Sequence, residues 1–85
     1  MIESTITDEK MQDIYKKIGK NVKEIRTKKG VSQLALAMAI GHKAVGTVSM
    51  AEICIKKKHF NIEHLYKIAE VLEVEVCEFF KDIKK

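Results

Sequence analysis

The sequence predicts an all-α protein, a compact domain of five helices around one core. The chain has 85 residues and no proline, so no residue interrupts helices through a missing N–H group. Its hydrophobic fraction is 46% but its aromatic fraction is only 6%, which favours a core of Leu, Ile, Val, Ala and Met. A chain of this length buries roughly 60–65% of its unfolded-chain surface on folding. We therefore expect one small domain over residues 8–85, preceded by a tail, residues 1–7.

The first predicted helix covers residues 8–29. Thr7 or Asp8 is its predicted N-cap, and Gly30 ends it. Its apolar residues recur every three or four positions, which gives one buried stripe: Met11, Ile14, Tyr15, Ile18, Val22 and Ile25.

Two short helices follow, with a tight turn between them. Ser32 is a strong N-cap for residues 33–40, and Gly41 suits the left-handed position after Ile40. A second short segment, at about residues 44–53, ends near Glu52. Two short helices joined by a turn present one exposed helix to the major groove of DNA. This region therefore predicts nucleic-acid binding.

The rest of the chain predicts a loop and two further helices. Asn61 is a clear N-cap for a helix that runs to about residue 72. Its buried stripe and that of a terminal helix, residues 75–82, consist of Ile62, Leu65, Ile68, Ala69, Leu72, Val76, Phe79, Phe80 and Ile83.

Charge is distributed unevenly along the chain. Residues 10–59 hold 12 Lys and Arg against 3 Asp and Glu, a balance of +9, whereas residues 1–9 carry −3 and residues 60–85 carry −2. A basic middle with acidic ends suits a polyanionic partner on one face. The alternative is that these lysines only solvate exposed helix faces.

Several classes are not expected. Two cysteines make no disulfide framework, and no apolar run resembles a signal peptide or a membrane span, so we expect a cytoplasmic protein with reduced thiols and no membrane partner. Without a Gly-rich phosphate loop we expect neither an enzyme nor a cofactor. The Cys54-x4-His59-x4-His64 spacing matches no compact zinc pattern, so no metal is expected. Cys54 and Cys77 are expected to act as small core hydrophobes.

The chain resembles the lambda-repressor-like helix-turn-helix family, which includes phage repressors, Cro proteins and small bacterial regulators. The resemblance spans about residues 18–80 and implies a five-helix DNA-binding domain. The shared elements run in order: Ile18-Gly19 with Val22, Ile25 and Arg26; Gly30-Val31-Ser32-Gln33; Leu36-Ala37; Ile40-Gly41; Val48; Glu52; Leu65; Ile68-Ala69; Leu72; Val74; and Glu78-Phe79-Phe80.

The resemblance also implies a structural ion pair. It aligns Arg26, the only arginine, with a family arginine that pairs with the glutamate ending the recognition helix, here Glu52. A planar guanidinium suits a partly buried carboxylate better than an ammonium does. We expect this pair to stabilise the fold and to have no catalytic role.

The DNA contacts implied by the resemblance fall into two groups. Phosphate contacts are expected from the start of the second helix, at Ser32 and Gln33, and from Lys56, Lys57, Lys58, His59 and Asn61. Base-edge contacts are expected from His42, Lys43, Thr47, Ser49 and Met50.

The predicted reading helix departs from the family pattern. Six residues separate Gly41 from Val48, one more than usual, and His42 and Lys43 are poor caps; Thr47 is an alternative cap that leaves a very short helix. We therefore expect two or three base contacts at most, with affinity resting mainly on phosphates.

The sequence predicts two exposed apolar surfaces, and more than one partner could cover them. Leu34 and Met38, one turn apart, form a patch that the tail, a second subunit or a foreign protein covers. For the tail, the covering residues are Ile2, Ile6 and Met11. Phe79, Phe80 and Ile83 are the other candidate dimer surface, with one of the two phenylalanines needed in the core.

The leading prediction is a dimeric regulator that binds palindromic double-stranded DNA, such as a repressor or the controller of a restriction-modification locus. The alternative is an antitoxin or protein-interaction module, which uses the helix-turn-helix as a scaffold and helix 33–40 to bind a toxin or another partner.

Overall fold

A computed structural model describes residues 2–41 and 45–83 of the chain. Within these residues every regular element is helical, which agrees with the predicted all-α class. The elements are α1 (Asp8–Lys28), α2 (Gln33–Ala39), α3 (Val45–Ile53), the 3-10 helix η1 (Ile55–Lys57), α4 (Ile62–Leu72) and the 3-10 helix η2 (Val76–Phe80).

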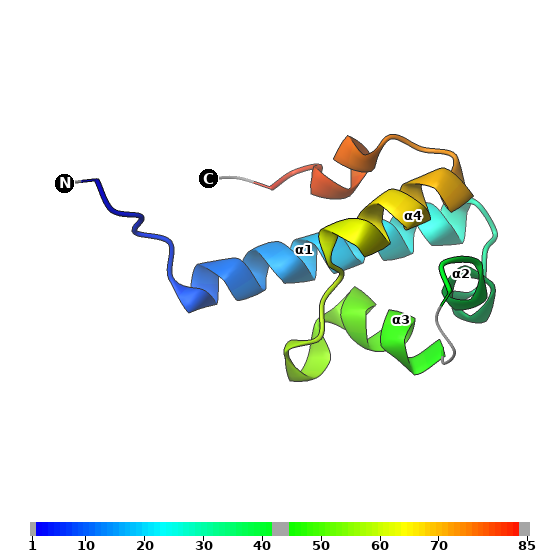
Figure 1. Cartoon of the computed structure of the whole chain (residues 1–85), viewed down its shortest axis with the longest axis horizontal. Coiled ribbons are helices and arrows are strands. Elements are labelled where there is room, and N and C mark those ends of the chain that lie inside the picture. Colours follow the sequence, from blue (N-terminus) through cyan, green and yellow to red (C-terminus); the bar gives the residue numbers. More distant parts are fainter. Residues whose placement is uncertain (1, 42–44, 84–85) are drawn as a thin grey trace.

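The long helix α1 runs along much of the molecule, beyond which the N-terminal tail extends (Figure 1), and it packs mainly against α3 and η2. Helix α3 and α2 lie on one side of α1, and η2 contacts it from the other. The buried core takes side chains from every α-helix and from η2. Its members are Ile18, Val22, Leu36, Ala37, Ile40, Val48, Ala51, Phe60, Leu65, Ile68, Ala69, Leu72 and Phe79.

Side-chain caps begin three of the helices at the predicted residues. The Thr7 hydroxyl accepts from the backbone N–H of Lys10 at 3.1 Å, and the Ser32 hydroxyl accepts from Ala35 at 3.0 Å. Asn61 Oδ1 accepts from the N–H of residue 64 at 2.7 Å. Each cap satisfies a donor that the first helical turn leaves without a partner, which is why these helices begin where they do.

Glycine ends the first two helices in the left-handed region. Gly30 has φ +71° after α1 and Gly41 has φ +89° after α2. A side chain is strained at such angles, whereas glycine adopts them freely.

The prediction of a fifth α-helix is wrong, because residues 76–80 form a 3-10 helix. Its flanking residues, Glu75 and Lys81, are both extended, and no side chain caps it. The Asn21 side chain of α1 donates to the carbonyl oxygens of Phe79 and Lys81, both at 2.9 Å. These carbonyls are therefore satisfied by α1 and not by further turns of helix.

The cysteine prediction is correct at one position and wrong at the other. Cys54 is buried, and its thiol donates to Gln12 Oε1 at 3.5 Å. Cys77 is exposed. In η2 the residues three apart share a face, so Val76 and Phe79 face inward and Cys77 faces solvent.

None of the helices in the described residues has both the length and the apolar character that a membrane crossing requires.

Candidate nucleic-acid interface

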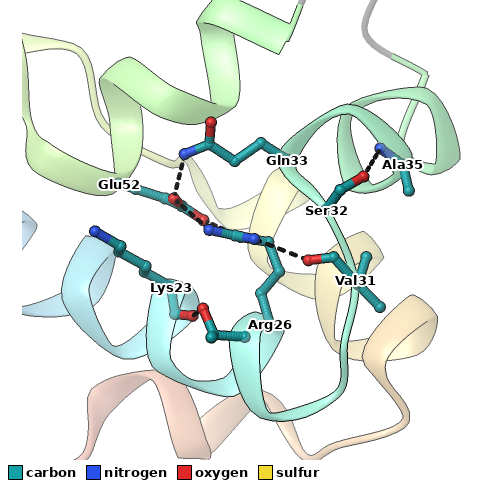
Figure 2. Close-up of polar contacts among 8 residues, drawn as sticks. Lys23, Arg26, Val31, Ser32, Gln33, Ala35 and Glu52 are labelled. Carbon is teal, nitrogen blue, oxygen red and sulfur yellow. Dashed lines mark hydrogen bonds and ion pairs between the residues drawn. The ribbon is translucent and has the colours of Figure 1, made fainter.

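A buried polar network joins α1, α2 and α3 (Figure 2). Arg26 donates to both carboxylate oxygens of Glu52, from Nε at 2.6 Å and from Nη2 at 3.2 Å. Its Nη1 also donates to the carbonyl oxygen of Val31 at 2.8 Å. The Glu52 side chain is fully buried and that of Arg26 nearly so. Arg26 and Glu52 thus form the ion pair that the resemblance implies, in the bidentate geometry that a guanidinium favours.

The Gln33 side chain completes this network. Its Nε2 donates to Glu52 Oε1 at 2.8 Å, so it points toward the ion pair (Figure 2). The Ser32 hydroxyl is likewise occupied by the N–H of Ala35. Gln33 therefore fixes the start of α2 against α3 and Ser32 caps α2, while the contact of both side chains with phosphate stays a prediction.

Gly19 sets the distance between α1 and α3. A Cβ atom at this position would lie 2.5 Å from the carbonyl oxygen of Glu52 and 2.6 Å from that of Ala51. Backbone atoms cannot yield to such contacts as a flexible side chain does. Only glycine allows α1 to approach the end of α3 this closely.

Helix α3 turns one face to the core and the other outward. Val48, Ala51 and Glu52 are buried, whereas Thr47 is exposed and Met50 is half-buried. Thr47 lies inside the first turn, because the helix begins at Val45, and the alternative in which Thr47 caps the helix is therefore wrong.

The other predicted base-contacting residues are Ser49, His42 and Lys43, of which the structure describes only Ser49. The Ser49 hydroxyl donates back to the carbonyl oxygen of Gly46 at 3.1 Å, so one of its hydrogen bonds is made within the helix. His42 and Lys43 lie outside the described residues.

The predicted loop after α3 contains a short 3-10 turn and carries the predicted phosphate-contacting lysines. Lys56, Lys57 and Lys58 are all exposed. Cys54, Lys56 and Lys57 have φ between 53° and 61°, a conformation that costs a non-glycine residue about 1 kcal/mol or more. The chain therefore presents three ammonium groups on a tightly wound segment next to α3.

His59 is placed by a contact that the sequence did not reveal. Its ring stacks on Tyr15 of α1, with centroids 3.7 Å apart and planes 5° apart, and Nδ1 donates to the carbonyl oxygen of Phe60 at 3.2 Å. The ring is half-buried, so His59 joins the lysine loop to α1. Its predicted phosphate contact, and that of the exposed cap Asn61, remain predictions.

Two isoleucines near this face were not predicted as part of the site. Ile53 is 57% exposed at the end of α3, and Ile55 is 45% exposed in η1. The spacing of Met50 and Ile53, three residues apart, was the available signal for a shared apolar face.

Among the residues that the structure describes, no group of three or more His, Cys, Asp and Glu side chains is placed to hold a metal ion.

This arrangement defines a helix-turn-helix DNA-binding protein: α3 lies at the edge of the molecule, α2 and the buried network fix its position, and lysines follow it. A comparison with protein families agrees, since the helix-turn-helix family matches residues 22–79. The chain belongs to this family, in its lambda-repressor-like branch.

A solved structure extends the comparison. The chain is similar to the restriction-modification controller protein C.AhdI from Aeromonas hydrophila, with 31% sequence identity and a TM-score of 0.68. The similarity covers 80% of this chain and 97% of that one. A search of curated protein sequences found no significant match.

Proposed function

We propose that this protein is a transcription regulator that binds palindromic double-stranded DNA as a homodimer and reads it through α3. The observation that carries the proposal is the placement of α3, which the Arg26–Glu52 pair holds by its inner face while Thr47 and Met50 face outward. A rigid helix with one free face is what major-groove recognition requires. Residues 8–85 would act as one DNA-binding unit in the cytoplasm.

The distribution of charge supports a contribution of lysine–phosphate contacts to DNA affinity. Lys56, Lys57 and Lys58 are exposed beside α3, in the part of the sequence where basic residues exceed acidic ones by nine. Lysines near phosphates release condensed counterions, so binding of this kind weakens steeply with salt.

The similarity to C.AhdI supports a more specific role. That protein is a restriction-modification controller, and nearly its whole length is matched here. We propose that this chain likewise controls transcription at a restriction-modification locus.

An apolar groove supports the dimer. The groove has a volume of about 380 Å³ and lies between the first half of α1, the start of α4 and η2. Ile62 is 64% exposed and Phe80 41% exposed at its edge, whereas Phe79 is wholly buried. Of the two phenylalanines, Phe79 therefore fills the core, and Phe80 is available to a second copy of the chain.

Selection of DNA with a salt titration tests the proposed function. The purified protein is mixed with random duplexes, and the retained fragments are sequenced and used in gel shifts. We expect a two-fold symmetric sequence and a logarithm of the binding constant that falls linearly with the logarithm of salt. The absence of any retained duplex at low salt would remove the proposal.

A second candidate rests on α2. Leu34 is 55% exposed and Met38 69% exposed, and the tail does not cover them, because Ile2 is fully exposed and Ile6 60% exposed. An uncovered apolar patch of this kind suits a protein partner. If this candidate holds, Leu34→Ser abolishes capture of a protein encoded beside this gene and leaves DNA binding unchanged.

A further inference from the structure

Gly46 occupies an unexpected place in α3. It is the second residue of the helix, two positions before the fully buried Val48. Residues two apart in an α-helix point to nearly opposite sides, so Gly46 lies on the outward face, one turn before Met50. Glycine within a helix is less stable than alanine, because its backbone loses more freedom on folding.

Nothing within the described part of the protein requires glycine at this position. Apart from its two chain neighbours and the backbone of α3 itself, a Cβ atom on Gly46 would meet no atom within 4 Å, and none from the Met50 side chain. The other three glycines each have an internal reason. Gly19 would place a Cβ 2.5 Å from a backbone oxygen, and Gly30 and Gly41 have left-handed φ angles.

The residues of the outward face of α3 indicate which chemical group of DNA could occupy the space beside Gly46. Between Val45 and Ile53 the sequence has no Arg, Lys, Asn or Gln, the residues that most often form bidentate hydrogen bonds with bases. The Glu52 carboxylate is bound to Arg26 and Gln33. Gly46 and Met50, at the centre of this face, carry no N–H or O–H group on their side chains, and the apolar group that DNA presents in the major groove is the C5-methyl of thymine.

We propose that Gly46 is a specificity-determining residue, whose missing side chain leaves room for the C5-methyl group of a thymine. Met50 lies one turn after Gly46 on the outward face of α3, and Thr47, the residue after Gly46, is exposed. This inference rests on the proposed function, since it requires α3 to enter the major groove. Beyond the proposed function, it names the base that α3 recognises, a thymine, and the way in which the helix recognises it.

Gly46→Ala tests the inference because it gives opposite effects on folding and on binding. A more favourable helix residue raises the melting temperature by about 2 to 8 °C. The added methyl occupies the space of the thymine methyl, so the dissociation constant for the duplex selected by the wild-type protein rises about 5- to 100-fold. Equal affinity of the two proteins would overturn the inference.

A control and a modified duplex identify the group involved. Thr27→Ala, on the exposed surface of α1, favours helix in the same way but leaves α3 unchanged, and we expect unaltered DNA affinity. Replacing thymines one at a time by deoxyuridine should weaken wild-type binding at one position of each half-site. At that position the penalty of Gly46→Ala should become smaller.

The outcomes separate the two proposals. A wild-type protein that retains no duplex removes the proposed function, and this inference with it. A wild-type protein that binds, together with a Gly46→Ala penalty unchanged by every deoxyuridine, preserves the proposed function and excludes the thymine contact.

Discussion

The two sides of the helix-turn-helix differ in how completely their groups are bound. On the inner side, Arg26, Gln33 and Glu52 satisfy one another at 2.6 to 3.2 Å, and Gly19 admits the backbone of α3 without a side chain. On the outer side, Thr47 is exposed, and a Cβ atom added to Gly46 would meet no side chain beyond its chain neighbours within 4 Å. The two sides of α3 therefore have different roles: the inner side fixes the position of the helix, and the outer side is available to a ligand.

Glu52→Gln should have the largest effect on stability. It leaves the nearly buried charge of Arg26 without a counter-ion, which costs about 3 to 5 kcal/mol of a total of about 5 to 15 kcal/mol. Urea unfolding measures the change. If the loss is below about 1 kcal/mol, the inner network does not hold the two helices as described.

Gly19→Ala should have the second largest effect on stability. Its Cβ would meet the carbonyl oxygens of Ala51 and Glu52, so α1 and α3 must separate, at a cost of about 1 to 3 kcal/mol. Gly46→Ala is the matched control, because the same substitution meets open space and should stabilise the protein. Equal melting temperatures for the two variants would show that the inner and outer sides are not packed differently.

Replacing Lys56, Lys57 and Lys58 by Gln should leave folding unchanged and weaken DNA binding. Each lost phosphate contact lowers the salt slope by about 0.9, so the slope should fall by up to about 3. Gel shifts at several salt concentrations measure it. Lys67→Gln on α4 is the control for the loss of one charge, and a fall in its slope of one third of that in the triple variant would show that net charge alone is responsible.

The smallest effect is expected at the exposed pair of Lys67 and Glu63, 2.9 Å apart on α4. The hydrogen bond and the charge of Lys67 lower the pKa of Glu63 from its ordinary value of 4.5. Its contribution is therefore present above pH 4.5 and is lost as the pH falls through the lowered pKa. Melting curves of wild type and Glu63→Gln should differ slightly at pH 7 and coincide at pH 2; a large difference at pH 7 would contradict the weak coupling of exposed pairs.

The sequence predicted what local chemistry determines. The caps at Thr7, Ser32 and Asn61 depend on residues three positions away. Helical periodicity also gave the buried apolar residues of α1 and α4, which include Ile18, Val22, Leu65, Ile68, Ala69 and Leu72. It was wrong at Ile62, which lies in the first turn of α4 and is 64% exposed. The Arg26–Glu52 pair joins distant residues and came from the resemblance to a known family.

The contacts that the sequence did not predict join distant parts of the chain. The stack of Tyr15 on His59 and the hydrogen bonds of Asn21 to the end of η2 depend on how helices pack. The same holds for Gln33, whose side chain was expected to face phosphate and donates to Glu52. The identity of the residue at one position does not show whether its polar side chain bonds to DNA phosphate or to another residue of the protein.

The most direct test is the change in backbone amide NMR signals when the selected duplex is added. We expect the largest changes at Gly46 and Thr47 on the outer face of α3 and at Lys56 to Lys58, with little change at Glu70 on α4. Changes that gather on α4 or on the α2 patch of Leu34 and Met38, with α3 unaffected, would contradict the claim that α3 reads DNA.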